Sequence, residues 1–240
     1  MKKLIPLSLA LVLSISVSAQ WGKRVKGNGN VVTLTKTTSD YEEIALSGSF
    51  DVELVDGKEG NITLQGEENI LQHIKIEVKN NKLTIKPEKG MNLNSSTGKN
   101  VVITIPIESI NAASLSGSGD IVGKKKIIAD SFETSISGSG DISLKIAAKK
   151  LKASISGSGD INLSGSAIDF TIRVSGSGDI SAYNLDADFV TALVSGSADI
   201  KVTAKESIDA RVSGSGDIYY KGNPKKIESK TSGSGGISKG

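Results

Sequence analysis

One hexapeptide, Ser-Gly-Ser-Gly-Asp-Ile, recurs through the second half of the chain and constrains its fold more than any other feature. The copies begin at Ser116, Ser137, Ser156, Ser175, Ser195, Ser213 and Ser232, at intervals of 21, 19, 19, 20, 18 and 19 residues. The fifth copy has Ala198 for its second glycine, and the seventh has Gly236 for its aspartate. A nearly fixed period of this length is typical of stacked structural units, in which each unit buries its apolar surface against the next.

The residues before each hexapeptide alternate between apolar and polar, which predicts a β-strand with one buried face. Five residues before the first serine stand Phe132, Leu151, Phe170, Val190, Ile208 and Ile227. A second short strand is expected after each corner, and no repeat contains an amphipathic segment of helix length. We therefore predict an all-β chain, a right-handed parallel β-helix-like solenoid of about 20-residue coils in which those six side chains form one buried file.

The corner itself is expected to need glycine, because glycine permits a positive φ angle and the close approach of neighbouring coils. The glycines assigned to this structural corner are Gly117, Gly138, Gly157, Gly176, Gly196, Gly214 and Gly233. Ala198 indicates that the second glycine position does not strictly require a positive φ.

The N-terminal residues 1–19 have the pattern of a secretory signal peptide. Lys2 and Lys3 form a basic start, an apolar stretch follows, and small residues precede an expected cleavage between Ala19 and Gln20. The alternative, a membrane anchor, would need a longer apolar stretch. We therefore expect export to the periplasm, the outer-membrane surface or the medium. The chain has no cysteine, which excludes disulfides and cysteine-based zinc sites.

The mature chain divides into a lead-in and two continuous parts of one domain. Residues 20–30 are rich in Gly and Asn and are expected to be flexible, residues 31–110 to form a less regular β part, and residues 111–240 the solenoid. Two alternating runs joined by Asn80-Asn81 predict a hairpin over 74–86. The segment 47–52, SGSFDV, is a degenerate early copy of the hexapeptide and is assigned to the irregular part.

Charge and hydropathy exclude two classes of partner. The chain has 29 Lys and Arg against 26 Asp and Glu, and two of the lysines leave with the signal peptide. A nearly neutral mature protein is not expected to bind nucleic acid. After the signal peptide no stretch reaches membrane-spanning length, so the protein is not expected to span a membrane.

The aspartates of the hexapeptide are the strongest candidates for chemistry. Stacking would place them in one row: Asp120, Asp141, Asp160, Asp179, Asp199 and Asp217. At a strand spacing of about 4.8 Å their carboxylates repel one another by about 1 kcal/mol per pair even in water. One explanation is structural, with each carboxylate accepting backbone N–H bonds. The other is a row of Ca²⁺ ions, since Ca²⁺ prefers oxygen ligands.

The remaining candidates are weaker. Rows of serine hydroxyls, such as Ser137 and Ser156, would either bind sugars or form a solvated face. His73 has no neighbouring residues with metal-ligand spacing and is expected to be a surface or cap residue. Arg173 and Arg211 would lie on the outward face, which leaves open a polysaccharide-acting enzyme, although such enzymes need paired carboxylates or a base. The uniform repeats favour a non-catalytic protein.

Several segments together resemble one known family. GSFDVELVDG, EGNITLQGEENIL, KNNKLTIKP and the serial SGSGDI corners are similar to the bacterial family named putative auto-transporter adhesin, head GIN domain. The resemblance covers residues 31–237. It implies a β-helix-like secreted or envelope protein of a type common in Bacteroidetes, and it supplies no catalytic residues.

We therefore expect an exported, non-catalytic envelope or surface protein that acts as an adhesin-like interaction module, with a glycan or a protein as its ligand. The alternatives are a polysaccharide-acting enzyme and a carbohydrate-binding protein. The last coil has Ser229 and Thr231 where earlier coils are mostly apolar, and no capping element follows it. An open coil edge favours pairing, so we also expect a homodimer through this end.

Overall fold

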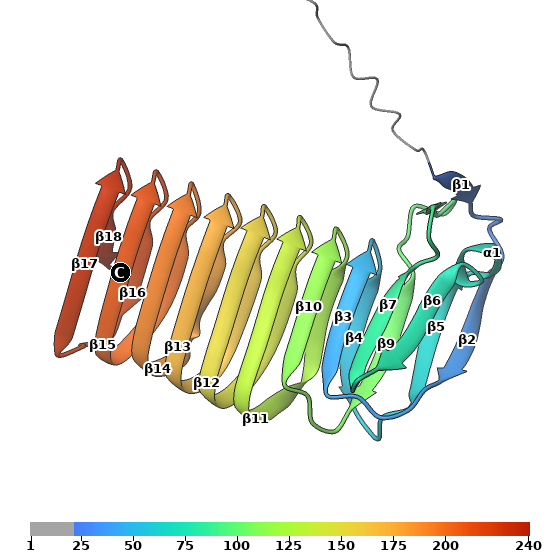
Figure 1. Ribbon diagram of the computed structural model, residues 1–240, viewed down its shortest axis with the longest axis horizontal. Coiled ribbons are helices and arrows are strands. Elements are labelled where there is room, and N and C mark those ends of the chain that lie inside the picture. Colours follow the sequence, from blue (N-terminus) through green and yellow to red (C-terminus); the bar gives the residue numbers. More distant parts are fainter. Residues whose placement is uncertain (1–21) are drawn as a thin grey trace, which may run out of the picture.

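The protein is a stack of parallel β-coils that is closed at one end by antiparallel strands (Figure 1). The computed structural model describes residues 22–240, so the expected signal peptide and its cleavage between Ala19 and Gln20 lie outside the described residues. Only one short helix, α1 (Glu68–Leu71), interrupts the strands of this part. The prediction of an all-β solenoid is confirmed.

Five long strands form the regular part of the stack. Each begins at the end of one hexapeptide and ends at the first glycine of the next: β11 (Asp120–Gly138), β12 (Ile142–Gly157), β13 (Ile161–Gly176), β14 (Ile180–Gly196) and β15 (Ile200–Gly214). Neighbouring strands pair in parallel and in register at the corners, with Gly138 opposite Gly157 and Gly157 opposite Gly176. One long strand is therefore one coil.

Each coil has two sides that face each other across the core. In β12 the buried side chains are Ile142, Leu144 and Ile146, and then Leu151, Ala153 and Ile155. The residues between these two sets are half-buried or exposed, and the pairing with β11 skips Lys149. The chain therefore bends at this point without a glycine corner, and the bend lies at the opposite edge of the stack from the hexapeptides (Figure 1).

The six residues expected to form one buried file are aligned as predicted. The pairing runs from Phe132 through the neighbouring coils to Ile227 without a register break at these positions. The first five are at most 2% exposed, whereas Ile227 is 49% exposed because it belongs to the terminal coil. The buried residues of all coils form a single hydrophobic core.

The degenerate early copy is part of the stack. β3 (Glu43–Gly48) pairs with β10 (Ala112–Gly117) so that Gly48 lies opposite Gly117, and β4 (Asp51–Asp56) pairs with β11 so that Asp51 lies opposite Asp120. The coils therefore begin earlier than the predicted boundary at residue 111. The prediction assigned this copy to the irregular part because a long insertion separates it from the next corner.

The insertion forms the cap at the N-terminal end of the stack. Its strands are β5 (Asn61–Glu67), β6 (Ile74–Lys79), β7 (Lys82–Pro87), β8 (Met91–Asn94) and β9 (Val102–Ile107). β7 and β9 extend the two sides by pairing in parallel with β3 and β4, and then β6 and β5 pair antiparallel with them. Asn80 and Asn81 adopt φ angles of 49° and 60° at the turn between β6 and β7.

The residues expected to form a flexible lead-in include an ordered strand. β1 (Lys23–Lys26) pairs in parallel with β8, and β2 (Val31–Thr37) follows it as the antiparallel edge strand beside β5. Between them the backbone N–H groups of Gly27, Asn28 and Gly29 donate hydrogen bonds to Asn94, Asn69 and Glu67. The expectation of a flexible lead-in is therefore wrong for the described residues of this segment. Its glycines and asparagines form a hydrogen-bonded turn through which the chain enters the cap.

The stack ends in three short strands. β16 (Ile218–Lys221) and β17 (Lys226–Gly233) pair with β15 and form the last complete coil, and β18 (Ile237–Lys239) begins a further coil by pairing with β16. Every residue of β17 is exposed. The helix of the described region is too short to cross a membrane.

Candidate functional site

The first glycine of each hexapeptide turns the chain from one side of the coil to the other. These seven glycines adopt φ angles between 123° and 148°, a region that side-chain-bearing residues rarely enter. A Cβ atom on Gly157 would lie 2.2 Å from the carbonyl oxygen of Gly138 in the preceding coil. Both the backbone angle and the close approach of the coils therefore require glycine at this position.

The second glycine has ordinary backbone angles but almost no space. A Cβ atom on Gly159 would lie 2.0 Å from the carbonyl oxygen of Gly140. In most coils both the serine before it and this glycine donate N–H bonds to the same carbonyl, as Ser158 and Gly159 do to Gly138 at 2.8 and 3.2 Å. In the fifth coil Ser197 makes this bond to Gly176, but among the described residues Ala198 does not. Ala198 is thus accommodated at the cost of one hydrogen bond.

The aspartates form a continuous row of hydrogen bonds between coils. In each step the Oδ1 atom of one aspartate accepts the backbone N–H of the aspartate in the next coil: Asp141 to Asp120 (3.1 Å), Asp160 to Asp141 (2.9 Å), Asp179 to Asp160 (2.8 Å), Asp199 to Asp179 (2.7 Å) and Asp217 to Asp199 (3.0 Å). Asp217 in turn accepts the N–H of Gly236 at 2.6 Å. Each carboxylate therefore holds the following coil to its own.

This row supports a structural role for the aspartates. The attraction between each carboxylate oxygen and the backbone N–H that it accepts offsets the repulsion between neighbouring carboxylates. Within residues 22–240 no three His, Cys, Asp or Glu side chains converge as a metal-binding group. The row of Ca²⁺ ions remains the alternative hypothesis for these aspartates.

A groove of about 700 Å³ crosses the outer face of the coils just before the corners. Two parallel rows of side chains line it, one residue from each coil. We call the first the serine row: Ser137, Ser156, Ser175, Ser195, Ser213 and Ser232. We call the second the mixed row: Ser135, Ser154, Arg173, Leu193, Arg211 and Lys230.

The cations of the mixed row differ in their surroundings. Arg211 donates from Nε and Nη2 to the two oxygens of Asp209, at 3.1 and 2.9 Å. Arg173 has Ser154 and Leu193 beside it in the neighbouring strands, and no carboxylate of the described residues lies within ion-pair distance of it. Its guanidinium fork is therefore available to an anionic or hydroxylated ligand.

The lining of the outer groove lacks the carboxylate pair of a glycoside hydrolase. It contains Ser, Arg, Lys and aliphatic residues but no Asp, Glu or His. Glycoside hydrolysis needs a pair of carboxylates across the scissile bond.

One structured carboxylate was missed by the sequence analysis. Glu67 is 3% exposed and accepts four hydrogen bonds: from the hydroxyls of Ser96 and Ser95 (2.6 and 2.7 Å) and from the backbone N–H groups of Gly29 and Ser96 (2.6 and 2.7 Å). The serine hydroxyls are the main reason that its pKa is lowered to about 2. Glu67 ties the lead-in and the loop after β8 to the cap. No sequence spacing indicated it, because its partners lie far along the chain.

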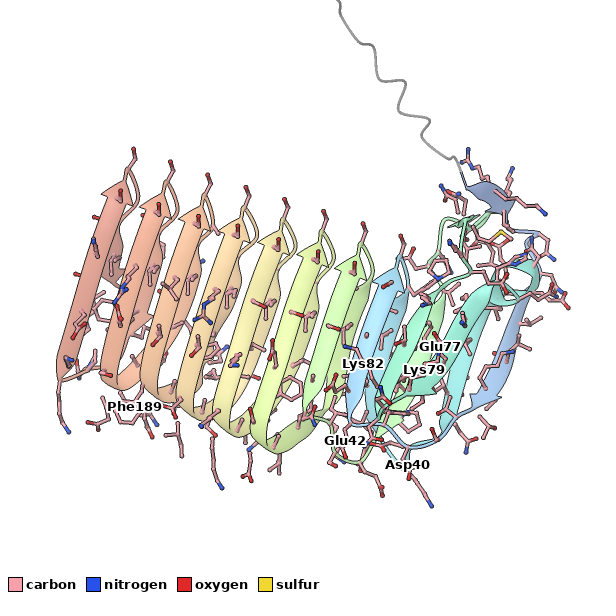
Figure 2. The ribbon with its side chains drawn as sticks, in the orientation of Figure 1. Asp40, Glu42, Glu77, Lys79, Lys82 and Phe189 are labelled. Carbon is pink, nitrogen blue, oxygen red and sulfur yellow. The ribbon has the colours of Figure 1, made fainter. Side chains whose placement is uncertain are left out.

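Two other features have local roles. The Nδ1 atom of His73 lies 2.8 Å from Glu88 at the surface of the cap. Phe189 lies at the bend edge, as Figure 2 shows, and is 47% exposed. Ile128 and Ile168, near the same edge, are also exposed. These three residues fall at different positions of the coil and do not form one row.

The chain is similar to several solved structures. It is 28% identical to a putative adhesin from Bacteroides fragilis, with a TM-score of 0.82 over 90% of this chain and 99% of that one. It is 27% identical to a putative lipid-binding protein from Parabacteroides distasonis, with a TM-score of 0.73 over 91% of this chain and 100% of that one. A putative adhesin from Parabacteroides merdae, at 22% identity and a TM-score of 0.71 over 90% and 99% of the two chains, shares the fold.

Comparison with curated proteins gives no match. Comparison with family models gives one that covers residues 40–224, from just before β3 to just after β16. The matched region contains the early copy, the cap and six of the hexapeptides, which are the features that build the stack. The chain belongs to the family described as putative auto-transporter adhesin, head GIN domain.

Proposed function

We propose that the protein is an exported, non-catalytic module of the bacterial envelope or surface that binds an elongated glycan along the outer groove. The observation that carries this proposal is the periodicity of the groove. The serine row and the mixed row repeat once per coil, at a strand spacing of about 4.8 Å. A ligand with a repeating polar backbone can therefore make the same contact several times.

The chemistry of the lining favours a sugar chain with some negative charge. Serine hydroxyls both donate and accept hydrogen bonds, as sugar hydroxyls do. Arg173 adds a planar donor fork that matches a carboxylate or sulfate group. The apolar residues between the two rows, such as Val174 and Ile155, border the groove but are only 2% exposed, because their side chains face the core.

Three observations support export and the absence of catalysis. The N-terminal residues have the pattern of a signal peptide, the chain belongs to a family described as adhesin-like, and the groove lining contains no acid–base pair. Mass spectrometry of protein recovered from a Bacteroidetes host should find Gln20 as the N-terminal residue. An intact Met1, or protein confined to the cytoplasm, would contradict export.

A binding screen with matched variants tests the groove. We expect the purified protein to bind acidic polysaccharides on a glycan array, and Arg173→Ala to weaken that binding about tenfold or more. Lys201→Ala is the control, because Lys201 is an exposed cation on the other side of the coil. Equal losses in both variants would indicate non-specific charge attraction rather than the groove.

Anionic lipid vesicles form the competing arm of the screen, since one similar structure is described as a putative lipid-binding protein. Binding to vesicles but to no glycan would overturn the choice of ligand. Release of reducing ends or unsaturated products from any bound polysaccharide would overturn the absence of catalysis.

A further inference from the structure

We propose that the C-terminal end of the solenoid is a homodimer interface, formed when β17 pairs antiparallel with β17 of a second copy. Among the described residues, β17 pairs only with β15 and β18 only with β16. The outer edge of β17 therefore presents backbone N–H and C=O groups without a strand partner. Such an edge is a template for pairing with another chain.

The two ends of the stack differ in how the edge is protected. At the N-terminal end the parallel coils are followed by antiparallel strands. On the outer strand β6 Glu77 forms ion pairs with Lys75 and Lys79, at 3.0 and 3.2 Å, and Figure 2 shows Glu77 and Lys79 at this end of the stack. At the C-terminal end the described residues provide no such cap. Ile227, the last member of the buried file, is 49% exposed there.

The sequence of β17 is complementary to itself in one register. If two copies pair antiparallel about Ser229, each Glu228 lies opposite the partner's Lys230. On the inward face each Ile227 lies opposite the partner's Thr231. Residues opposite each other in an antiparallel pair interact directly, and opposite charges there are favourable. The core side chains stay on the core side in this arrangement, so the core of one copy continues into the other.

Neighbouring registers that keep the same faces inward are less favourable. Moving the centre to Glu228 places like carboxylates opposite each other, and moving it to Lys230 does the same with two ammonium groups. A register about Ile227 again matches opposite charges, but within β17 it pairs only residues 226–228. The register about Ser229 pairs residues 226–232, nearly the whole of β17.

The preceding coil repeats the same charge pattern. Asp209 of β15 lies beside Glu228, and Arg211 lies beside Lys230. The end of the solenoid thus carries an acidic column next to a basic column. A two-fold axis through Ser229 places the acidic column of each copy opposite the basic column of the other.

Sedimentation velocity and small-angle scattering on the purified protein test this proposal. We expect a concentration-dependent dimer whose longest dimension is nearly twice that of the monomer. Lys230→Glu should weaken dimerisation about tenfold or more, because it places a second carboxylate opposite Glu228 in both cross-strand pairs. The double variant with Glu228→Lys and Lys230→Glu should restore the dimer. Lys36→Glu, on edge strand β2 at the other end, is the control and should leave the dimer unchanged.

Mixing the wild type with the double variant adds a specific readout. Each should form its own dimer, whereas the mixed dimer would bring like charges together and should be scarce in native mass spectrometry. A monomer at millimolar concentration would overturn the proposal. So would a dimer that is insensitive to Lys230→Glu, or one that is lost instead in Lys36→Glu.

Discussion

The Oδ1 atom of Asp160 accepts the backbone N–H of Asp179, one coil further along the stack, at 2.8 Å. The same bond is repeated by the aspartates on either side. A side chain conserved in every regular repeat of this chain thus does the work of a backbone carbonyl at the corner, where the strands no longer pair.

Two substitutions of Asp160 distinguish the effect of its hydrogen bond on stability from the effect of its negative charge. We expect Asp160→Ala to lower the free energy of unfolding by about 1–2 kcal/mol, because the N–H of Asp179 loses its acceptor. Asp160→Asn keeps an acceptor and removes repulsion from Asp141 and Asp179, so it should change stability by less than about 1 kcal/mol. Urea unfolding measures both. Asp169→Ala, at the exposed bend, is the control, and an equal loss there would contradict this role of the row.

The same row gives an expectation for calcium. Because each carboxylate already accepts a backbone N–H, we expect the melting temperature to be the same in millimolar Ca²⁺ and in chelator. Differential scanning calorimetry checks this. A melting temperature raised by Ca²⁺, with the increase abolished in Asp160→Asn, would show instead that the row binds the ion.

The two glycine positions of the corner should respond differently to a methyl group. Gly157→Ala forces a Cβ to within 2.2 Å of a carbonyl oxygen at a φ of 146°, so we expect a loss of at least about 2 kcal/mol. Ala198→Gly should let the backbone N–H at this position reach the carbonyl of Gly176, but it removes a buried methyl group, so its effect should stay within about 1 kcal/mol. Chemical denaturation measures both variants. A mild effect of Gly157→Ala would mean that the corner can relax.

The loss of unfolding free energy caused by a core substitution should depend on the position of the residue along the buried file. Phe170 is 1% exposed in the middle of the stack, and we expect Phe170→Ala to cost about 3–5 kcal/mol. Ile227 occupies the same file at its exposed end, and Ile227→Ala should cost the monomer about 1 kcal/mol or less. Unfolding at low protein concentration, where any dimer has dissociated, makes the comparison. Equal costs would mean that the terminal coil is covered in solution.

Glu67 should make the cap sensitive to acid. Its pKa is lowered from 4.5 to about 2 by the hydrogen bonds of Ser96 and Ser95, so the fold favours the ionised form. This contribution to stability is complete above pH 4.5 and is lost as the pH falls toward 2. Glu67→Gln should therefore destabilise the cap at neutral pH and flatten the dependence between pH 4.5 and 2.

Hydrogen exchange at the amides of Gly29 and Ser96 measures that effect locally.

Glu77 provides a comparison at the surface. Its pKa is also lowered to about 2, and the cause is the pair of lysines Lys75 and Lys79. Salt screens exposed ion pairs more strongly than hydrogen bonds inside the protein. In high salt the contribution of Glu77 to the stability of the cap should therefore decrease, whereas the contribution of Glu67 should persist. A salt-sensitive response at Ser96 would count against this account.

The parts of the fold that could be predicted are those set by short-range pattern. Period-2 alternation predicted the file from Phe132 to Ile227, and Asn80-Asn81 indicated the turn between β6 and β7. Each of these depends on residues close together in the chain or on exact repetition. Such signals do not require knowledge of how distant segments meet.

The parts that could not be predicted depend on distant contacts. Asp51 lies opposite Asp120 although 69 residues separate them, and nothing in the intervening sequence states that it returns to the same place. The bend at Lys149 has no glycine or proline to mark it. The outer groove could be anticipated as a row of hydroxyls, but its depth and the isolation of Arg173 arise only when the coils are stacked.

Every regular coil forms its strand pairs only with the coil before it and the coil after it. A tandem duplication or deletion of one coil in the gene would therefore lengthen or shorten the rod by one step and keep this pattern of strand pairing. The length of the outer face can therefore change between related proteins in steps of one coil.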